Sequence, residues 1–192
     1  MKGGEIMIST GNVSIVIGSW GSYNECNERA LGSKWLNLED YSDWEEIEAE
    51  LIEQGFELNG IDEELFIQDI EGIYSNGTNW EYVNPQTLFE TLKESGILDE
   101  SYKYEVFEAY IEVRSFSDWQ ELVNNYGYRW DDDIILYPKM DYTDLAYHMI
   151  HEVCCYEIPK WLENYVDYEA YGRDLRFDGY EEYSDGIIEI RR

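Results

Sequence analysis

Residues 43–65, DWEEIEAELIEQGFELNGIDEEL, contain ten carboxylates and no lysine, arginine or histidine, and this segment constrains the fold more than any other. The bias extends further, because residues 35–92 hold sixteen acidic residues and no basic one. Like charges three or four residues apart destabilise a helix by about 0.2–0.5 kcal/mol per pair. A folded chain with this segment therefore gives up local stability for a uniformly negative surface.

The same segment has the apolar pattern of one amphipathic helix. Ser42 and Glu45 match a capping box and Gly55 is a suitable helix end, so we expect a helix between them. The buried stripe of this helix would consist of Trp44, Ile47 and Leu51. The carboxylates opposite or beside that stripe are Glu45, Glu46, Glu48, Glu50 and Glu53.

The charge of the whole chain limits its partners. Its 192 residues include 43 acidic and 13 basic ones, which gives a net charge of −30. A disordered acidic chain would be poor in aromatic residues, whereas 16% of these residues are Phe, Trp or Tyr, so the acidity belongs to a folded surface. Such a surface repels nucleic acid and anionic lipid. We expect basic proteins or cations as partners, with no direct nucleic-acid binding and no membrane binding.

Cysteine content and hydropathy predict a soluble cytoplasmic protein. The three cysteines are an odd number, and Cys154 and Cys155 are adjacent, where a mutual disulfide would be strained. No run of 18 apolar residues occurs, and the first residues lack the apolar core of a secretion signal. Reduced thiols in a cytoplasm fit this pattern.

Local signals predict an α+β chain in three parts. The expected strands are residues 13–18, 65–71, 133–138 and 186–190. The expected helices are residues 42–55, 85–96 with Asn84 as its cap, 99–113, one capped by Ser117 with Gln120, 143–155, and a short one from Pro159. The predicted domains are an unassigned segment 1–11, an N-terminal α+β domain 12–80, a central helical domain 81–126 and a C-terminal α/β domain 127–192.

Two interpretations fit the acidic segment. A salt-adapted proteome would spread acidic residues evenly over the surface, but here most of the thirteen basic residues lie in the second half of the chain. The other interpretation is mimicry of a polyanion, because duplex DNA carries one charge per roughly 1.7 Å of axis and carboxylates on a helix approach that density. The segregation of charge favours mimicry, with strongly salt-dependent binding.

No pattern typical of an enzyme stands out. The polar stripe of the expected helix 143–155 consists of Asp144, His148, His151 and Cys155, in an order that matches no zinc-protease pattern. The run 131–133 lacks the spacing of a calcium loop. The many carboxylates allow paired acid/base chemistry, but no spacing singles out a pair. We expect no catalytic residue, no metal site and no cofactor.

A second unusual segment is NYVDYEAYGRDL, residues 164–175, in which Arg173 stands among carboxylates and tyrosines. Arginine with aromatic residues is typical of interfaces. An arginine that pairs a carboxylate at the edge of a core has the same composition, so residue types alone leave both interpretations open.

Three segments together resemble the ArdA family of antirestriction proteins, which are carried by conjugative plasmids, transposons and phages. The segments are IVIGSWGSYNECNERALGSKWLNL (15–38), LFIQDIE (65–71) and IPKWLENYVDYEAYGRDL (158–175), the last with the core Asp-Tyr-x-Ala-Tyr-Gly-Arg-Asp. The resemblance spans roughly residues 12–190, with the middle helices similar mainly in acidity and length. It does not cover residues 1–11, and Cys26 stands where a glycine is expected.

The resemblance implies an elongated three-domain protein that is dimeric through its C-terminal domain and mimics bent B-form DNA. It further implies a stoichiometric inhibitor, not an enzyme, that occupies the DNA groove formed by the specificity and methyltransferase subunits of a type I restriction-modification enzyme in a bacterial host. The alternative function is an acidic binding module that sequesters another basic DNA-binding protein, such as a nucleoid protein or repressor.

Two residue sets follow for these roles. The carboxylates expected to stand in for phosphates are Asp43, Glu45, Glu46, Glu48, Glu50, Glu53, Glu57, Asp62, Glu63, Glu64, Asp69 and Glu71. The residues of the antirestriction motif, which the resemblance assigns to the dimer interface, are Tyr165, Asp167, Tyr168, Glu169, Tyr171, Gly172, Arg173 and Asp174.

Overall fold

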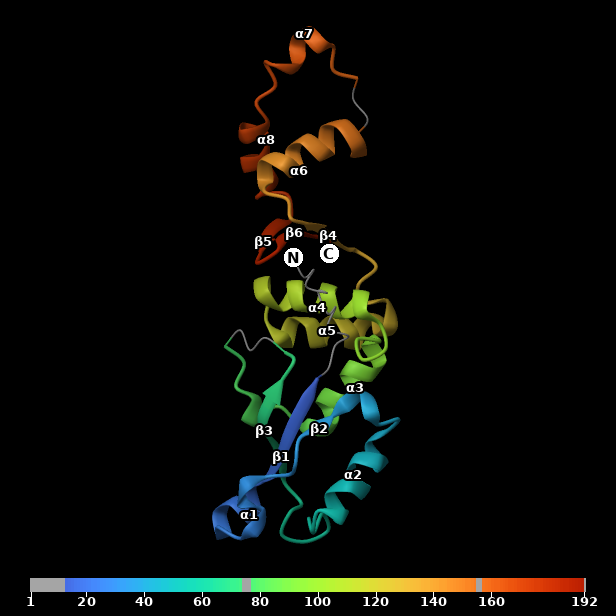
Figure 1. The fold of residues 1–192 in the computed structure, drawn as a ribbon, viewed down its shortest axis with the longest axis vertical. Coiled ribbons are helices and arrows are strands. Elements are labelled where there is room, and N and C mark those ends of the chain that lie inside the picture. Colours follow the sequence, from blue (N-terminus) through green and yellow to red (C-terminus); the bar gives the residue numbers. More distant parts are fainter. Residues whose placement is uncertain (1–12, 74–76, 155–156, 192) are drawn as a thin grey trace, which may run out of the picture.

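The structure, a computed structural model, describes residues 13–73, 77–154 and 157–191. Within these residues it is a mixed α+β fold with eight α-helices and two three-stranded antiparallel sheets. Figure 1 shows an elongated molecule with the first sheet near one end, a layer of helices in the middle and the second sheet followed by further helices toward the other end. The expected α+β class is confirmed, and the division into three domains stays a prediction.

The first sheet has the strand order β2-β1-β3. Its strands are β1 (Ser14–Ser19), β2 (Leu36–Asn37) and β3 (Leu65–Glu71), and a register shift lies between Val16 and Ile17 of β1. The apolar runs that predicted β1 and β3 are confirmed, because Ile15, Ile17 and Ile67 are fully buried. The connections carry α1 (Trp20–Glu25), the 3₁₀ turns η1 (Glu28–Leu31) and η2 (Leu38–Asp40), and α2 (Trp44–Glu53).

The predicted capping box of α2 was displaced by one residue. Asp43, not Ser42, is the N-cap, because its carboxylate accepts a hydrogen bond of 3.0 Å from the Glu46 amide. The Glu46 carboxylate in turn accepts one of 2.7 Å from the Ser42 amide. The helix ends at Glu53, and Gly55 follows with a φ of +91°.

Three helices form the middle layer. They are α3 (Pro85–Ser95), α4 (Ser101–Val113) and α5 (Phe116–Tyr126), with the 3₁₀ turns η3 (Trp80–Tyr82) before them and η4 (Gly127–Arg129) after them. The Asn84 cap with Pro85 is confirmed. The expected cap at Ser117 and Gln120 was wrong, because the capping box is Ser115 with Asp118 and this adds the buried Phe116 to the helix.

The second sheet has the strand order β4-β6-β5. The strands are β4 (Ile134–Pro138), β5 (Tyr180–Tyr183) and β6 (Gly186–Ile190). Between β4 and β5 lie α6 (Tyr142–His148), which continues as the π-helical turn η5 (Met149–Val153), then α7 (Lys160–Glu163) and α8 (Tyr168–Leu175). The expected helix 143–155 therefore changes hydrogen-bond pattern after His148, and its last residue, Cys155, lies outside the described residues.

Two hydrophobic clusters form the core. The larger one includes residues of β1, α2, α3, α4 and α5 and reaches Ile134 and Ile188 in the second sheet. The smaller one lies on the other side of that sheet and includes Tyr137, Leu145 and Leu175. One face of the second sheet therefore packs against the larger cluster and the other face against the smaller one. Within the described residues, no helix is long and apolar enough to cross a bilayer.

Candidate acidic interface

The carboxylates of α2 point outward because the opposite side of the helix is buried. Trp44, Ile47 and Leu51 belong to the larger hydrophobic cluster, and Ile47 and Leu51 are completely inaccessible to solvent. This burial confirms the predicted stripe and fixes the rotation of the helix. The resulting surface, which we call the α2 acidic face, consists of Asp43, Glu45, Glu46, Glu48, Glu50 and Glu53.

Several carboxylates of the α2 acidic face accept hydrogen bonds from neutral donors. The indole Nε1 of Trp44 lies 3.1 Å from Glu48 Oε1, and the side-chain amide of Gln54 lies 2.8 Å from Glu50 Oε1. The Ser42 amide holds Glu46 in the same way. These donors restrict the side chains without removing their charge.

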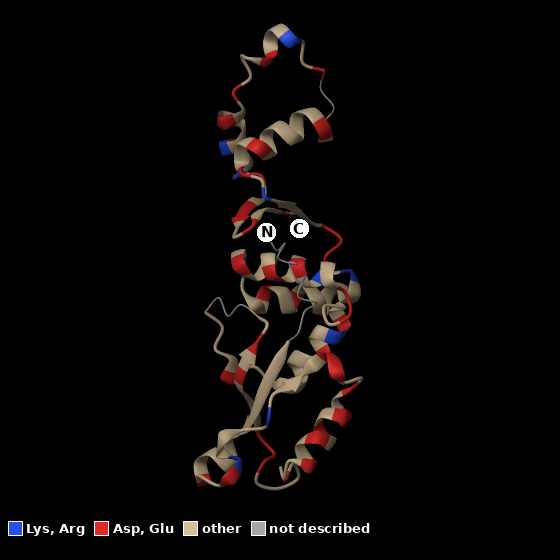
Figure 2. Cartoon of the chain, viewed as in Figure 1, with Lys and Arg blue, Asp and Glu red and all other residues tan. Residues whose placement is uncertain are grey.

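The lysines and arginines that form ion pairs in the described residues pair with carboxylates outside the α2 acidic face. The ion pairs of its lysines and arginines among the described residues are Arg29 with Asp62, Lys103 with Asp131, Arg114 with Glu181, Arg129 with Asp132 and Arg191 with Glu189. Lys93 shares a groove with Asp43, Glu45 and Glu48 but forms no ion pair with them. The α2 acidic face therefore has no ion pair within the described part of the chain, and Figure 2 shows its acidic residues without interleaved basic ones.

The remaining predicted carboxylates occupy two other places. Glu57, Glu63 and Glu64 are exposed in the loop between α2 and β3. Asp69 and Glu71 are exposed on β3, which is the edge of the sheet opposite β2, whereas α2 lies on the β2 side (Figure 1). The predicted set is therefore spread around the sheet and does not form one compact cluster.

Asp62 does not belong with the surface carboxylates. It is fully buried and its Oδ2 lies 3.0 Å from Nε of Arg29, so it cannot present a charge to a partner. Its place in the predicted set was wrong, because burial depends on residues more than thirty positions earlier in the chain.

An acidic groove beside α4 escaped the sequence analysis. It has a volume of about 470 Å³, and Glu105, Glu108 and Glu112 line it from α4 while Asp185 lines it from the turn between β5 and β6. Burial raises the pKa of Glu108, and the charges of Glu112 and Glu105 add to this effect, while a hydrogen bond from Tyr104 opposes it. The sequence did contain a signal for this groove, because spacing by three and four residues places the three glutamates on one face of a helix.

The antirestriction motif forms α8, with residues on two sides. Asp167 caps the helix by accepting a hydrogen bond of 2.9 Å from the Ala170 amide. The inner side packs on α6, where Gly172 is buried and the hydroxyl of Tyr168 lies 2.7 Å from Nε2 of His151. The outer side exposes Tyr165 before the helix and Glu169, Arg173 and Asp174 within it. Among the described residues, no ion pair includes Arg173.

Apolar side chains are exposed at the same end of the molecule. Phe177 is 88% exposed, Tyr165 80% and Trp161 71%. Figure 1 shows α7, which carries Trp161, projecting beyond α6 and α8. Large aromatic side chains exposed on neighbouring segments are typical of a protein–protein contact.

The described side chains of the predicted polar stripe lie on α6 and η5 and are engaged in local contacts. His148 Nδ1 lies 3.1 Å from Glu152 Oε2, and His151 contacts Tyr168. The Asp144 carboxylate accepts a hydrogen bond from the Asp141 amide as part of the cap of α6. In the run 131–133, Asp131 and Asp132 form ion pairs with Lys103 and Arg129.

Comparison with known proteins assigns the chain to a family. A search of curated proteins gave no match. A model of the family described as antirestriction protein (ArdA) matches residues 15–189, a range that includes both sheets, the α2 acidic face and α8. The chain therefore belongs to the ArdA family, whose membership implies an antirestriction function.

Proposed function

We propose that this protein is a stoichiometric inhibitor, without catalytic activity, that occupies the DNA-binding groove of a type I restriction-modification enzyme. The observation that carries the proposal is the α2 acidic face, whose six carboxylates are held outward by a buried stripe while the ion-paired arginines and lysines bind other carboxylates. A protein groove that binds DNA phosphates is lined by lysine and arginine, which could pair with these carboxylates.

The charge spacing on α2 supports mimicry of one DNA strand. Glu45, Glu46, Glu48, Glu50 and Glu53 are spread over eight residue steps, or about 12 Å of helix axis at 1.5 Å per residue. That is one charge per about 3 Å of helix axis, close to the 3.4 Å of duplex axis per phosphate of one DNA strand. Binding to a cationic groove would release counterions from both partners, so it should weaken steeply as salt rises.

We also propose that the C-terminal end forms a homodimer. The exposed Trp161, Tyr165 and Phe177 supply apolar contact area, and Arg173 supplies a charged group free to pair across an interface. Two chains with a net charge of −30 each would carry −60 and present two α2 acidic faces. The protein would act in the cytoplasm of a bacterial host, bound to the specificity and methyltransferase subunits of the enzyme.

The test is displacement of a fluorescent DNA duplex from a purified type I methyltransferase core over a series of salt concentrations. We expect displacement near one dimer per DNA site, with an affinity that falls steeply with salt. Absence of displacement at low salt, with an active enzyme, would overturn the proposal and point to another basic DNA-binding protein as the partner.

A matched pair of variants separates the α2 acidic face from total charge. Replacing Glu46 and Glu53 by lysine should weaken displacement by more than tenfold and flatten the salt dependence, and adding Glu50→Lys should weaken it further. The control replaces Glu81 in η3 and Glu121 in α5, two exposed acidic residues away from both α2 and the proposed dimer contact, by lysine with the same change in net charge. Equal effects of the two double variants would rule out a specific role of α2.

A further inference from the structure

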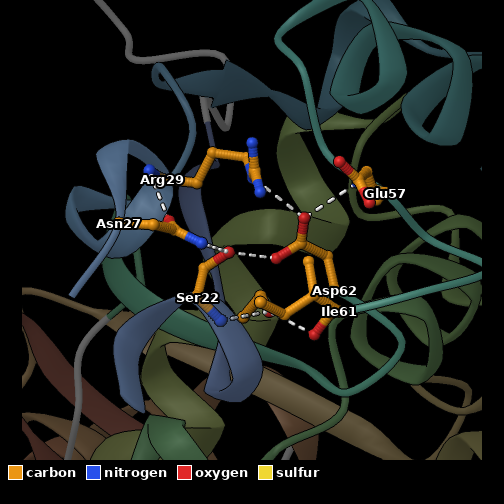
Figure 3. Close-up of polar contacts among 7 residues, drawn as sticks. Ser22, Asn27, Arg29, Glu57, Ile61 and Asp62 are labelled. Carbon is orange, nitrogen blue, oxygen red and sulfur yellow. Dashed lines mark hydrogen bonds and ion pairs between the residues drawn. The ribbon is translucent and has the colours of Figure 1, made fainter. Parts of the chain in front are cut away.

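The fully buried Asp62 lies at the centre of a polar cluster that joins three segments of the N-terminal end (Figure 3). Its Oδ1 accepts a hydrogen bond from the hydroxyl of Ser22 in α1. Its Oδ2 accepts one of 3.0 Å from Nε of Arg29 in η1 and one of 2.8 Å from the backbone amide of Glu57. One carboxylate therefore ties α1, η1 and the loop after α2 together.

The loop that carries Asp62 is closed on itself and packed against α1. Within the loop, the amides of Gly60 and Asp62 both donate to the carbonyl of Glu57, at 2.9 and 3.1 Å. A Cβ added to Gly21 of α1 would lie only 1.8 Å from the carbonyl oxygen of Ile61, so α1 lies directly on the loop. The loop is thus held by contacts on both sides.

The charge of Asp62 is stabilised inside the protein. Burial alone would raise its pKa, but the hydrogen bonds from Ser22 and the Glu57 amide, with the charge of Arg29, lower the pKa below its usual value. The carboxylate is therefore ionised at neutral pH and neutralises Arg29, whose side chain is 24% exposed. Without Asp62, a guanidinium would be left unpaired beside the acidic loop.

We propose that Asp62 is a positioning residue for the acidic interface: it fixes the loop 54–64 so that Glu57, Glu63 and Glu64 keep a set place relative to α2, and it masks the charge of Arg29. This inference rests on the proposed function, because it assigns a role within the same surface. A fixed loop loses less conformational entropy when it binds, so the gain is in affinity and not in the number of charges engaged.

Three single variants test this role. Asp62→Asn removes the buried charge with little change in shape, and Ser22→Ala removes one donor of the cluster without changing any charge. The control Glu63→Gln removes one charge from an exposed neighbour outside the cluster. Each variant is measured in two ways: amide hydrogen exchange of residues 54–64 in the free protein, and displacement of the DNA duplex from the methyltransferase core.

Positioning predicts a specific pattern. Asp62→Asn and Ser22→Ala should speed exchange in the loop at least tenfold while exchange in α4 and α5 stays unchanged. Both should weaken displacement by about tenfold; Ser22→Ala should preserve the salt slope, whereas Asp62→Asn, which also unmasks the charge of Arg29, should flatten it slightly. Glu63→Gln should leave exchange unchanged, weaken displacement only about twofold and reduce the salt slope by about one unit.

The two readouts separate the possible failures. If amide hydrogen exchange of residues 54–64 is unchanged in both Asp62→Asn and Ser22→Ala, Asp62 does not hold the loop in place. Faster exchange with an affinity no lower than that of Glu63→Gln would overturn the positioning role. If the unaltered protein displaces no DNA, the proposed function fails and the positioning role fails with it, while exchange still reports whether Asp62 clamps the loop. Should Asp62→Asn fail to fold, Ser22→Ala, which keeps every charge, decides the question.

Discussion

Gly172 of α8 lies directly against the backbone carbonyl of Tyr142 at the start of α6. A Cβ on Gly172 would approach the Tyr142 carbonyl oxygen to 2.4 Å and the carbonyl carbon to 2.8 Å. Neither backbone atom can move away independently, so only glycine permits this separation of the two helices. Gly172 therefore contributes to the packing of the C-terminal end from inside, whatever its outer neighbours bind.

Replacing Gly172 by alanine should destabilise the protein. Overpacking in a well-packed site typically costs about 1–3 kcal/mol, and we expect a loss in this range in urea unfolding. The control is Glu169→Ala on the exposed side of α8, which should change the stability by less than about 0.5 kcal/mol. Similar losses for both variants would show that α6 and α8 are not tightly packed at Gly172.

Cys26 should be a site where glycine increases stability. It is the C-cap of α1 with φ of 51° and ψ of 37°, the left-handed conformation that costs an L-residue about 1–2 kcal/mol. Part of this gain is offset by the greater freedom of glycine in the unfolded chain, so Cys26→Gly should stabilise by roughly 0.5–1 kcal/mol.

A second exposed cysteine provides the control. Cys154 has φ of −80° and ψ of −15°, which any residue adopts, so Cys154→Gly should give no gain. Both substitutions remove one thiol, so urea midpoints compared under reducing conditions isolate the backbone effect. A gain at both sites, or at neither, would contradict the explanation.

Arg173 should contribute to dimer formation. Arg173→Ala removes an exposed guanidinium with no ion pair among the described residues, so it should shift sedimentation toward the monomer with little loss of stability. Arg129→Ala is the matched control, since Arg129 is also exposed but pairs with Asp132 near the middle of the chain. A variant at position 173 that stays fully dimeric would exclude the interface role.

Glu108 should make stability depend on pH in a direction set by burial. Its pKa in the folded protein is raised above 4.5, so the charged form is penalised and stability falls as pH rises from 4.5 through the raised pKa. Glu108→Gln should therefore raise the melting temperature at pH 7, and this gain should disappear below pH 4.5.

Asp118 should make stability change with pH in the opposite direction. Hydrogen bonds from Ser115 lower its pKa below 3.8, so its stabilising effect is complete above that value and is lost as pH falls through the lowered pKa. Asp118→Asn should lower the melting temperature at pH 7 and have less effect at pH 3. Identical pH profiles for Glu108→Gln and Asp118→Asn would contradict both assignments.

Elements with a strong local signal were predicted correctly from the sequence. The apolar runs gave β1, β3, β4 and β6, and the periodicity of Trp44, Ile47 and Leu51 gave the orientation of α2. The caps of α2 and α5 were misplaced, because both helices have a second acidic or hydroxyl residue close to the true cap.

Elements that depend on distant contacts were missed. β5, with the sequence YEEY, was absent from the expected strands, although the short turn before Gly186 was an available hairpin signal. The interior glycine of α8 disfavours a helix locally, and only the packing on α6 explains it. Asp62 looks like its exposed neighbours Glu63 and Glu64, and its burial depends on partners 33 and 40 residues away.

The larger hydrophobic cluster runs from Ile15 in the first sheet to Ile188 in the second. Close-packed interiors are poorly compressible, so these two sheets cannot approach or separate without opening voids in the layer between them. The part of the molecule between the two sheets should therefore be rigid, and its interior packing should fix the distances between the charges on its surface. Duplex DNA can be deformed for about 1–6 kcal/mol over a binding site. An enzyme that bends its DNA would therefore meet, in this protein, a partner whose shape it cannot change in the same way.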